Sequence, residues 1–81
     1  MNVHVHLFGP AADAAGADAV TVRLPEGAGC ADLRRELTGQ YPALEGLVQA
    51  GRFAINHEFA SEDQPLTGSD EVALIALVSG G

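Results

Sequence analysis

Alternating apolar and polar residues open the chain, with the period of two that is typical of a strand with one buried face. Val3, Val5 and Leu7 fall on one side of this segment, which leaves Phe8 on the other side. Further strand-like segments recur along the chain, and residues 56–57 are placed to form a tight hairpin turn. The predicted strands are residues 2–8, 19–24, 52–56, 58–60 and 72–78.

A helical period replaces the strand pattern at residues 30–40. Cys30, Leu33 and Leu37 recur at i, i+3 and i+7, which places them in one apolar stripe. This spacing predicts one main helix over residues 30–40. A shorter alanine-rich stretch, residues 11–17, is compatible with one or two further helical turns.

The order of these elements is strand, strand, helix, strand, short strand, strand. It predicts an α+β fold of the ubiquitin-like β-grasp type, with a mixed sheet of four to five strands and one main helix packed across one face. A chain of 81 residues is large enough for one core only. We expect residues 1–78 to form this β-grasp domain and residues 79–81 to be a flexible C-terminal glycine tail.

The last predicted strand is apolar on both of its faces. A single helix covers only one face of a sheet, so the outward residues of this strand would be exposed. An exposed apolar patch usually marks a protein–protein interface. The alternative is that a second short helix, or the segment of residues 42–51 expected as a loop, folds over this face and covers it. The residues predicted to form the interface are Phe8, Phe59, Ile75 and Leu77.

Charge and composition narrow the possible partners. The net charge is −7 and the chain contains no lysine, which argues against nucleic acid or an anionic membrane and favours a basic protein surface. The alternative is that the negative charge only keeps the protein soluble. No apolar run is long enough to cross a membrane, and no basic segment precedes an apolar one at the start. With a single cysteine in addition, we expect a cytoplasmic protein.

No residue cluster indicates a catalytic or metal site. His4, His6 and His57 are more often solvated than metal-bound in such positions, and no nucleophile accompanies them in a motif. Cys30 begins the helix, where a thiol can be reactive, but its place in the apolar stripe favours a buried core residue. We therefore expect no metal, and no enzyme in this chain alone.

The segment Ser79-Gly80-Gly81 carries almost no side chain and follows an apolar strand directly. Because glycine has no Cβ, such a tail fits a channel too narrow for other residues. The reactive group would then be the carboxylate of Gly81, presented to the active site of another protein. The alternative is a frayed end that is rich in glycine by chance.

Several short motifs together resemble the ThiS/MoaD family of ubiquitin-like sulfur carriers, most closely those that serve molybdopterin synthase. None of these motifs is specific for the family when taken alone. Their order, their spacing and the C-terminal Gly-Gly are specific when taken together. The motifs are Leu7-Phe8, Ala31-Asp32-Leu33, Phe53-Ala54-Ile55-Asn56-His57-Glu58-Phe59, Asp63-Gln64-Pro65-Leu66, Asp70-Glu71-Val72-Ala73-Leu74-Ile75 and Val78-Ser79-Gly80-Gly81.

The resemblance implies a carrier that has no catalytic side chain and binds no cofactor. A ubiquitin-activating-like adenylyltransferase would use ATP to adenylate the Gly81 carboxylate, and a persulfide would convert it to a thiocarboxylate. Ser79 and Gly80 would thread into the large subunit of molybdopterin synthase, where the sulfur forms the molybdopterin dithiolene. By the same resemblance, Phe8, Phe59 and Ile75 belong to the surface that contacts both partners.

Two other functions stay open at this point. A carrier of the same fold can serve thiamine or another sulfur-containing product, or act as a protein modifier. A β-grasp interaction domain with an incidental glycine tail would bind a partner and donate nothing.

Overall fold

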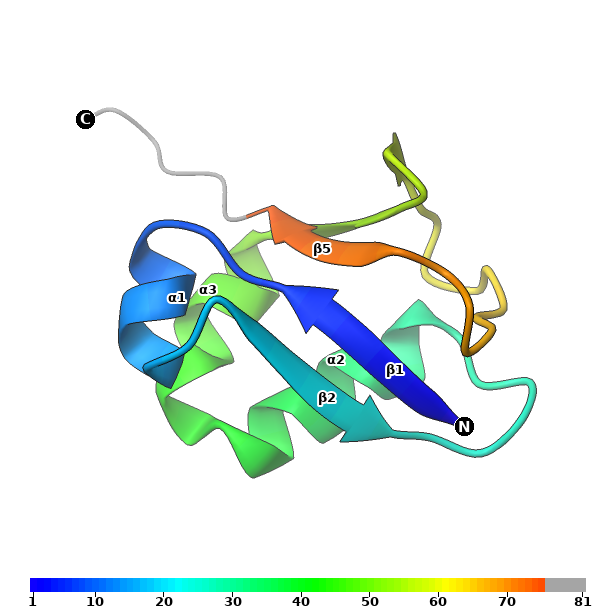
Figure 1. The fold of residues 1–81 in the computed structure, drawn as a ribbon, viewed down its shortest axis with the longest axis horizontal. Coiled ribbons are helices and arrows are strands. Elements are labelled where there is room, and N and C mark those ends of the chain that lie inside the picture. Colours follow the sequence, from blue (N-terminus) through cyan, green and yellow to red (C-terminus); the bar gives the residue numbers. More distant parts are fainter. Residues whose placement is uncertain (76–81) are drawn as a thin grey trace.

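The computed structural model describes residues 1–75, which form five strands, three α-helices and one 3-10 turn (Figure 1). In chain order these elements are β1 (Asn2–His6), α1 (Pro10–Ala15), β2 (Ala19–Arg23), α2 (Cys30–Gln40), η1 (Pro42–Leu44), α3 (Glu45–Ala50), β3 (Arg52–Ile55), β4 (Glu58–Phe59) and β5 (Val72–Ile75).

The strands form one mixed sheet in the order β2-β1-β5-β3-β4. β1 pairs antiparallel with β2 and parallel with β5, so the first and last strands lie side by side in the centre. β3 joins the far side of β5 in antiparallel register and is followed by β4 through a hairpin. This topology confirms the predicted ubiquitin-like β-grasp and its mixed sheet.

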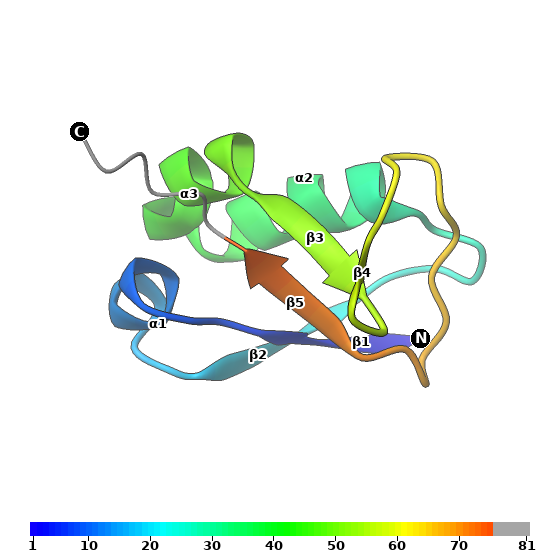
Figure 2. The same cartoon turned by 90° about the horizontal axis from the view of Figure 1, so that it is seen from above.

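The helices lie on one side of the sheet, and more of them are present than the one main helix predicted. α2 and α3 both cover the same face (Figure 2). Residues 42–51, expected as a loop, contain η1 and α3, and their side chains Leu44 and Val48 are fully buried in the core. The alternative in which this segment covers the outer face of the sheet is therefore wrong.

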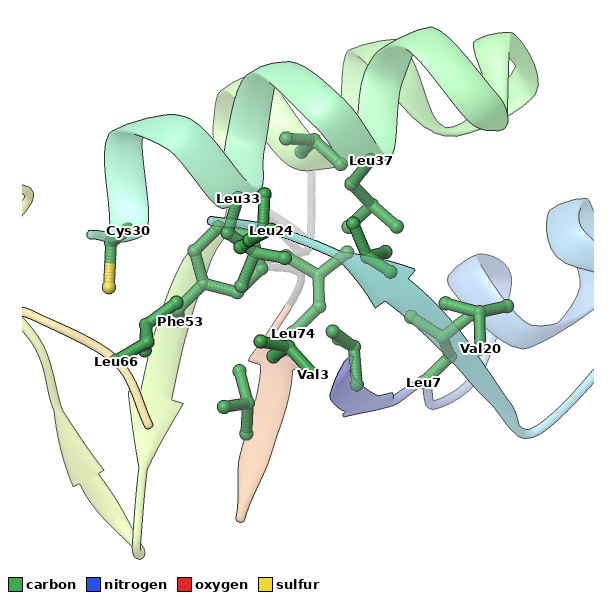
Figure 3. Close-up of a cluster of buried hydrophobic side chains, with 14 of the residues drawn as sticks. Val3, Leu7, Val20, Leu24, Cys30, Leu33, Leu37, Phe53, Leu66 and Leu74 are labelled. Atoms are coloured by element: carbon green, nitrogen blue, oxygen red, sulfur yellow. The ribbon is translucent and has the colours of Figure 1, made fainter. Parts of the chain in front are cut away.

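The core fills the space between the sheet and its helices (Figure 3). α2 buries the stripe that its period predicts, and every strand except β4 contributes alternate residues from its inner face. Phe53 of β3 is the largest fully buried side chain. The buried hydrophobic residues from the strands and α2 are Val3, Val5, Val20, Val22, Cys30, Leu33, Leu37, Phe53, Ile55, Val72 and Leu74.

Four predicted strands, residues 2–8, 19–24, 52–56 and 58–60, each end one or two residues earlier in the structure. β1 ends at His6, and the backbone N–H of Leu7 donates to the carbonyl of Asp18 at 2.7 Å. Phe8 therefore follows the strand end. The hairpin turn is as predicted: Asn56 and His57 have φ angles of 53° and 71°, the left-handed conformation of a type I′ turn.

Asp70 fastens the loop before β5 to this hairpin. Its Oδ2 accepts a hydrogen bond from the Thr67 backbone N–H at 2.8 Å, and its Oδ1 accepts one from Asn56 Nδ2 at 3.1 Å. The Thr67 hydrogen bond is the main cause that lowers the pKa of Asp70, followed by the bond from Asn56. The Asn56 side chain also accepts from the Glu71 backbone N–H at 3.0 Å, so it connects both segments.

Arg34 of α2 ties three parts of the chain together. Its guanidinium binds the Glu62 carboxylate through two hydrogen bonds of 2.9 Å, and it donates to the Val48 carbonyl of α3. The hydrogen bonds from Arg34 lower the pKa of Glu62. This arrangement holds residues 60–65 and the end of α3 against the middle of α2.

Candidate functional site

The outer face of the sheet, opposite α2 and α3, carries a continuous row of cross-strand neighbours. His6 of β1 pairs with Ala73 of β5, Ala73 pairs with Ala54 of β3, and Ala54 pairs with Phe59 of β4. Because strand residues alternate between faces, these four lie on the side away from the core. The two central members are alanines, so the middle of the row has only short side chains.

A hollow of about 410 Å³ lies over this row. Three large apolar side chains line it, Phe8 after β1, Phe59 in β4 and Ile75 at the end of β5. The alanine pair and the polar residues His6, His57 and Glu71 complete the lining. The hollow is thus mostly apolar, and its lining comes from four strands and three connecting segments of the chain.

Phe8 and Phe59 are the large hydrophobic side chains that residues 1–75 leave exposed, at 58% and 53%. Ile75 is half-buried beside them. The structure therefore brings together three of the four residues predicted to form an interface, on the predicted face. The fourth, Leu77, lies outside the described residues, and the interface role of all four stays a prediction.

Arg52 is a residue of this face that the sequence reasoning missed. It pairs across the strands with Ile75, and its guanidinium carbon lies 4.3 Å from the centre of the Phe59 ring, in cation–π contact. The signal that could have found it is the strand period, because Arg52 precedes Ala54 by two residues and so shares its face.

His57 and Glu71 form the polar border of the hollow. His57 Nε2 lies 3.0 Å from Glu71 Oε2, which makes an exposed ion pair when the imidazole is protonated. His4, on the same side of β1, has its Nδ1 at 2.9 Å from Thr21 Oγ1 of β2. Within residues 1–75, no three His, Cys, Asp or Glu side chains gather closely enough to hold a metal ion.

Cys30 is fully buried at the start of α2 and belongs to the core cluster. Burial raises the pKa of its thiol, and the nearby negative charge of Glu62 raises it further. A thiol that is kept protonated and away from solvent is a poor nucleophile. The interpretation of Cys30 as a core residue, rather than a reactive one, is confirmed.

The residues predicted to carry the chemistry are Ser79, Gly80 and Gly81, and they lie outside the described residues, as does the predicted boundary of the domain after residue 78. In sequence they follow Ile75, which lines the hollow. In the part of the chain that the structure describes, no helix is long and apolar enough to cross a bilayer.

The sheet order, the helices on one face and the exposed apolar face on the other define a ubiquitin-like β-grasp domain. Comparison with known proteins places the chain in a family. It belongs to the ThiS family, whose family model matches residues 5–81. The resemblance seen in the sequence motifs is thereby confirmed.

Two curated relatives carry the name molybdopterin synthase sulfur carrier subunit and are each 32% identical to this chain. The protein of Chlamydomonas reinhardtii matches over the whole of both chains. The protein of Dictyostelium discoideum matches over 93% of this chain and 91% of its own length. A third relative of the same name, from Arabidopsis thaliana, is 28% identical over all of this chain and 84% of its own.

Solved structures of similar proteins have the same fold. SAMP1 from Haloferax volcanii superimposes with a TM-score of 0.87 and 30% identity over the whole of both chains. A putative molybdopterin converting factor subunit 1 from Pyrococcus furiosus gives 0.84 and 26% identity, over 96% of this chain and 99% of its own. A chain from a complex of subunits 1 and 2 of the Helicobacter pylori molybdopterin-converting factor gives 0.70 with 22% identity over both chains, which shows the fold alone.

Proposed function

We propose that this chain is the sulfur carrier, and the small subunit, of a molybdopterin synthase. The proposal is carried by the family match, which extends through Gly80 and Gly81, together with the similarity to three relatives of that name. In this role the chain donates sulfur from its C-terminal Gly81 and is not an enzyme by itself.

The chemistry of the proposal begins with activation of a poor electrophile. The Gly81 carboxylate attacks the α-phosphorus of ATP in a ubiquitin-activating-like adenylyltransferase, and pyrophosphate leaves. A persulfide sulfur then attacks the carbonyl carbon of the acyl-adenylate, and AMP leaves. A thiol that cleaves the resulting acyl disulfide releases the thiocarboxylate, while that thiol ends in a disulfide. Splitting one difficult step into several is the general benefit of covalent intermediates.

The outer face supplies the docking surface in this proposal. Phe8, Phe59 and Ile75 lie together there, and the partner would be the large subunit of the synthase, with Ser79 and Gly80 threading the Gly81 carboxylate into its active site. Burial of about 400 Å² of apolar surface gives on the order of 10 kcal/mol before the costs of association are subtracted. A net charge of −7 favours a partner with a basic surface.

The proposal is tested by reconstitution of the synthase reaction with the large subunit, the adenylyltransferase, ATP, a persulfide source and the pterin precursor. We expect dithiolene product with the full chain and none with a chain that lacks Gly81. A matched control, Gly68→Ala, changes a glycine of an exposed turn and should retain activity. Equal product from the chain without Gly81 would overturn the proposal.

A second candidate function is protein modification, and the similarity to SAMP1, which is also known as small archaeal modifier protein 1, favours it. In that role an amine of a target protein, in place of the persulfide, would attack the activated Gly81 and form an amide bond. The chain has no lysine, so chains of copies linked through lysine would not form. Target proteins that gain the mass of this chain in the same reconstitution would identify this function.

A further inference from the structure

We infer that Arg52 binds a carboxylate of the partner protein, beside the apolar side chain of that partner which enters the hollow on the outer face. The inference rests on the proposed function, since it assumes that a partner covers this face. Beyond the proposed function, it identifies one group on the partner as a carboxylate and assigns its binding to Arg52.

The position of Arg52 follows from the strand register. It lies opposite Ile75 across the β3–β5 pairing, and its guanidinium stacks over the Phe59 ring at 4.3 Å. Both of these neighbours line the hollow. A partner that fills the hollow and contacts Ile75 and Phe59 would therefore also cover the Arg52 guanidinium.

A covered guanidinium needs an acceptor. Arg34 and Arg35 are paired with Glu62 and Asp32, whereas no carboxylate in residues 1–75 forms an ion pair with Arg52. Removing an unpaired cation from water is costly, and a carboxylate with bidentate hydrogen bonds offsets that cost best. Since this chain provides no such group within the described residues, the partner must provide it.

Other charged groups on this face cannot take that place. Glu71 is the acidic residue that lines the hollow, but it precedes β5 and lies four residues before Ile75, which corresponds to roughly 13 Å at the rise of an extended chain. Its carboxylate faces His57 instead. The stacking on Phe59 in turn holds the planar guanidinium in one orientation, so less side-chain entropy is lost when it binds a carboxylate.

The test measures the dissociation constant of the complex with the large subunit for three variants. Arg52→Glu places two like charges together and should weaken binding by about tenfold or more, mainly through faster dissociation. Arg52→Lys keeps the charge but loses the planar fork, so about threefold weaker binding is expected. Arg23→Glu is the matched control, because it makes the same change in net charge on β2, at the opposite edge of the sheet.

Equal effects of Arg52→Glu and Arg23→Glu on a complex that the unchanged protein forms would overturn the inference and leave the proposed function intact. Failure of the unchanged protein to bind the large subunit would overturn both. The positive result has a second readout: a lysine placed at one acidic position of the large subunit should restore binding to Arg52→Glu. Thermal unfolding of each variant confirms that the fold is retained.

Discussion

Gly51 is the residue whose lack of a side chain matters most to the packing of the described chain. A Cβ at this position would lie 2.7 Å from the carbonyl oxygen of Leu47 and 2.8 Å from that of Ile75, and both are backbone atoms. The glycine thus allows the end of α3 to approach the end of β5. Ile75 lines the hollow, so this close contact also fixes one side of the candidate interface.

We predict that Gly51→Ala lowers the free energy of unfolding by about 2 kcal/mol, because backbone must move to admit the methyl group. Gly39→Ala is the control: it lies in α2 with open space around it, and it should raise the free energy of unfolding by about 0.5–1 kcal/mol. Urea unfolding of both variants measures the difference. A Gly51→Ala variant as stable as Gly39→Ala would contradict the close approach.

Asp70 gives a prediction for pH dependence. Because the native state lowers the pKa of its carboxyl, the stabilisation is complete above the unfolded value of 3.8 and is lost as the pH falls through the lower native value. Asp70→Asn should therefore cost about 1 kcal/mol at neutral pH, and the difference from the unchanged protein should shrink below about pH 4. Unfolding by urea at several pH values measures it. Asp18→Asn, an exposed control, should cost less at neutral pH.

At the scale of elements, Arg34 connects α2 to two segments that are far away in sequence. Its side chain is only 18% exposed, and it binds both the Glu62 carboxylate and the Val48 carbonyl. We predict that Arg34→Ala lowers the free energy of unfolding by about 2 kcal/mol, because it leaves these acceptors without their donor.

Arg35→Ala is the matched control for this prediction. Its side chain is 78% exposed and its pairing with Asp32 is 3.5 Å long, so the expected change is within about 0.5 kcal/mol. Thermal or urea unfolding compares the two variants. Similar losses for both would show that the interactions of Arg34 do not hold these elements together.

How far the sequence predicts each element depends on the length and regularity of its pattern. α2 was predicted with its observed bounds, because its apolar stripe of Cys30, Leu33 and Leu37 repeats with the helical period over about two turns. α3 was missed because its six residues bury only Val48 and include Gly46, so no helical period is visible. The Arg34–Glu62 pair spans 28 positions, and nothing local in the sequence indicates such a contact.

The candidate site was also predicted only in part: its apolar residues were found from the sequence, and Arg52 was not. The alternation of strand residues placed Ile75 on the outer face correctly, because helices cover only the other side of the sheet. Phe8 also lines this face, although β1 ends two residues before it. The contact of Arg52 with Phe59 depends on the register across the hairpin of residues 56–57 and on side-chain conformation. Those follow from the three-dimensional structure and not from the period alone.

At the scale of the molecule, the two faces of the sheet have separate roles in our account: one forms the core and the other binds the partner. We predict that Phe59→Ala, on the outer face, weakens the complex with the large subunit by about tenfold or more while the free energy of unfolding changes by less than about 1 kcal/mol. Phe59 is 53% exposed, so little buried contact is lost in the free chain.

The control for this prediction is Phe53→Ala on the opposite face of the adjacent strand. Phe53 is 1% exposed and should cost about 3–5 kcal/mol of stability when truncated. Titration of the large subunit and urea unfolding measure both quantities. Unchanged binding by Phe59→Ala would contradict the assignment of the outer face as the docking surface.

The central claim is that the Gly81 carboxylate carries the sulfur, and an intact mass measurement tests it most directly. The chain is incubated with ATP, the adenylyltransferase and a persulfide source, then weighed and fragmented. Our account predicts a mass gain equal to the replacement of one oxygen by sulfur, located at Gly81 and absent without ATP. A chain of unchanged mass, under conditions in which the adenylyltransferase is shown to be active, would contradict it.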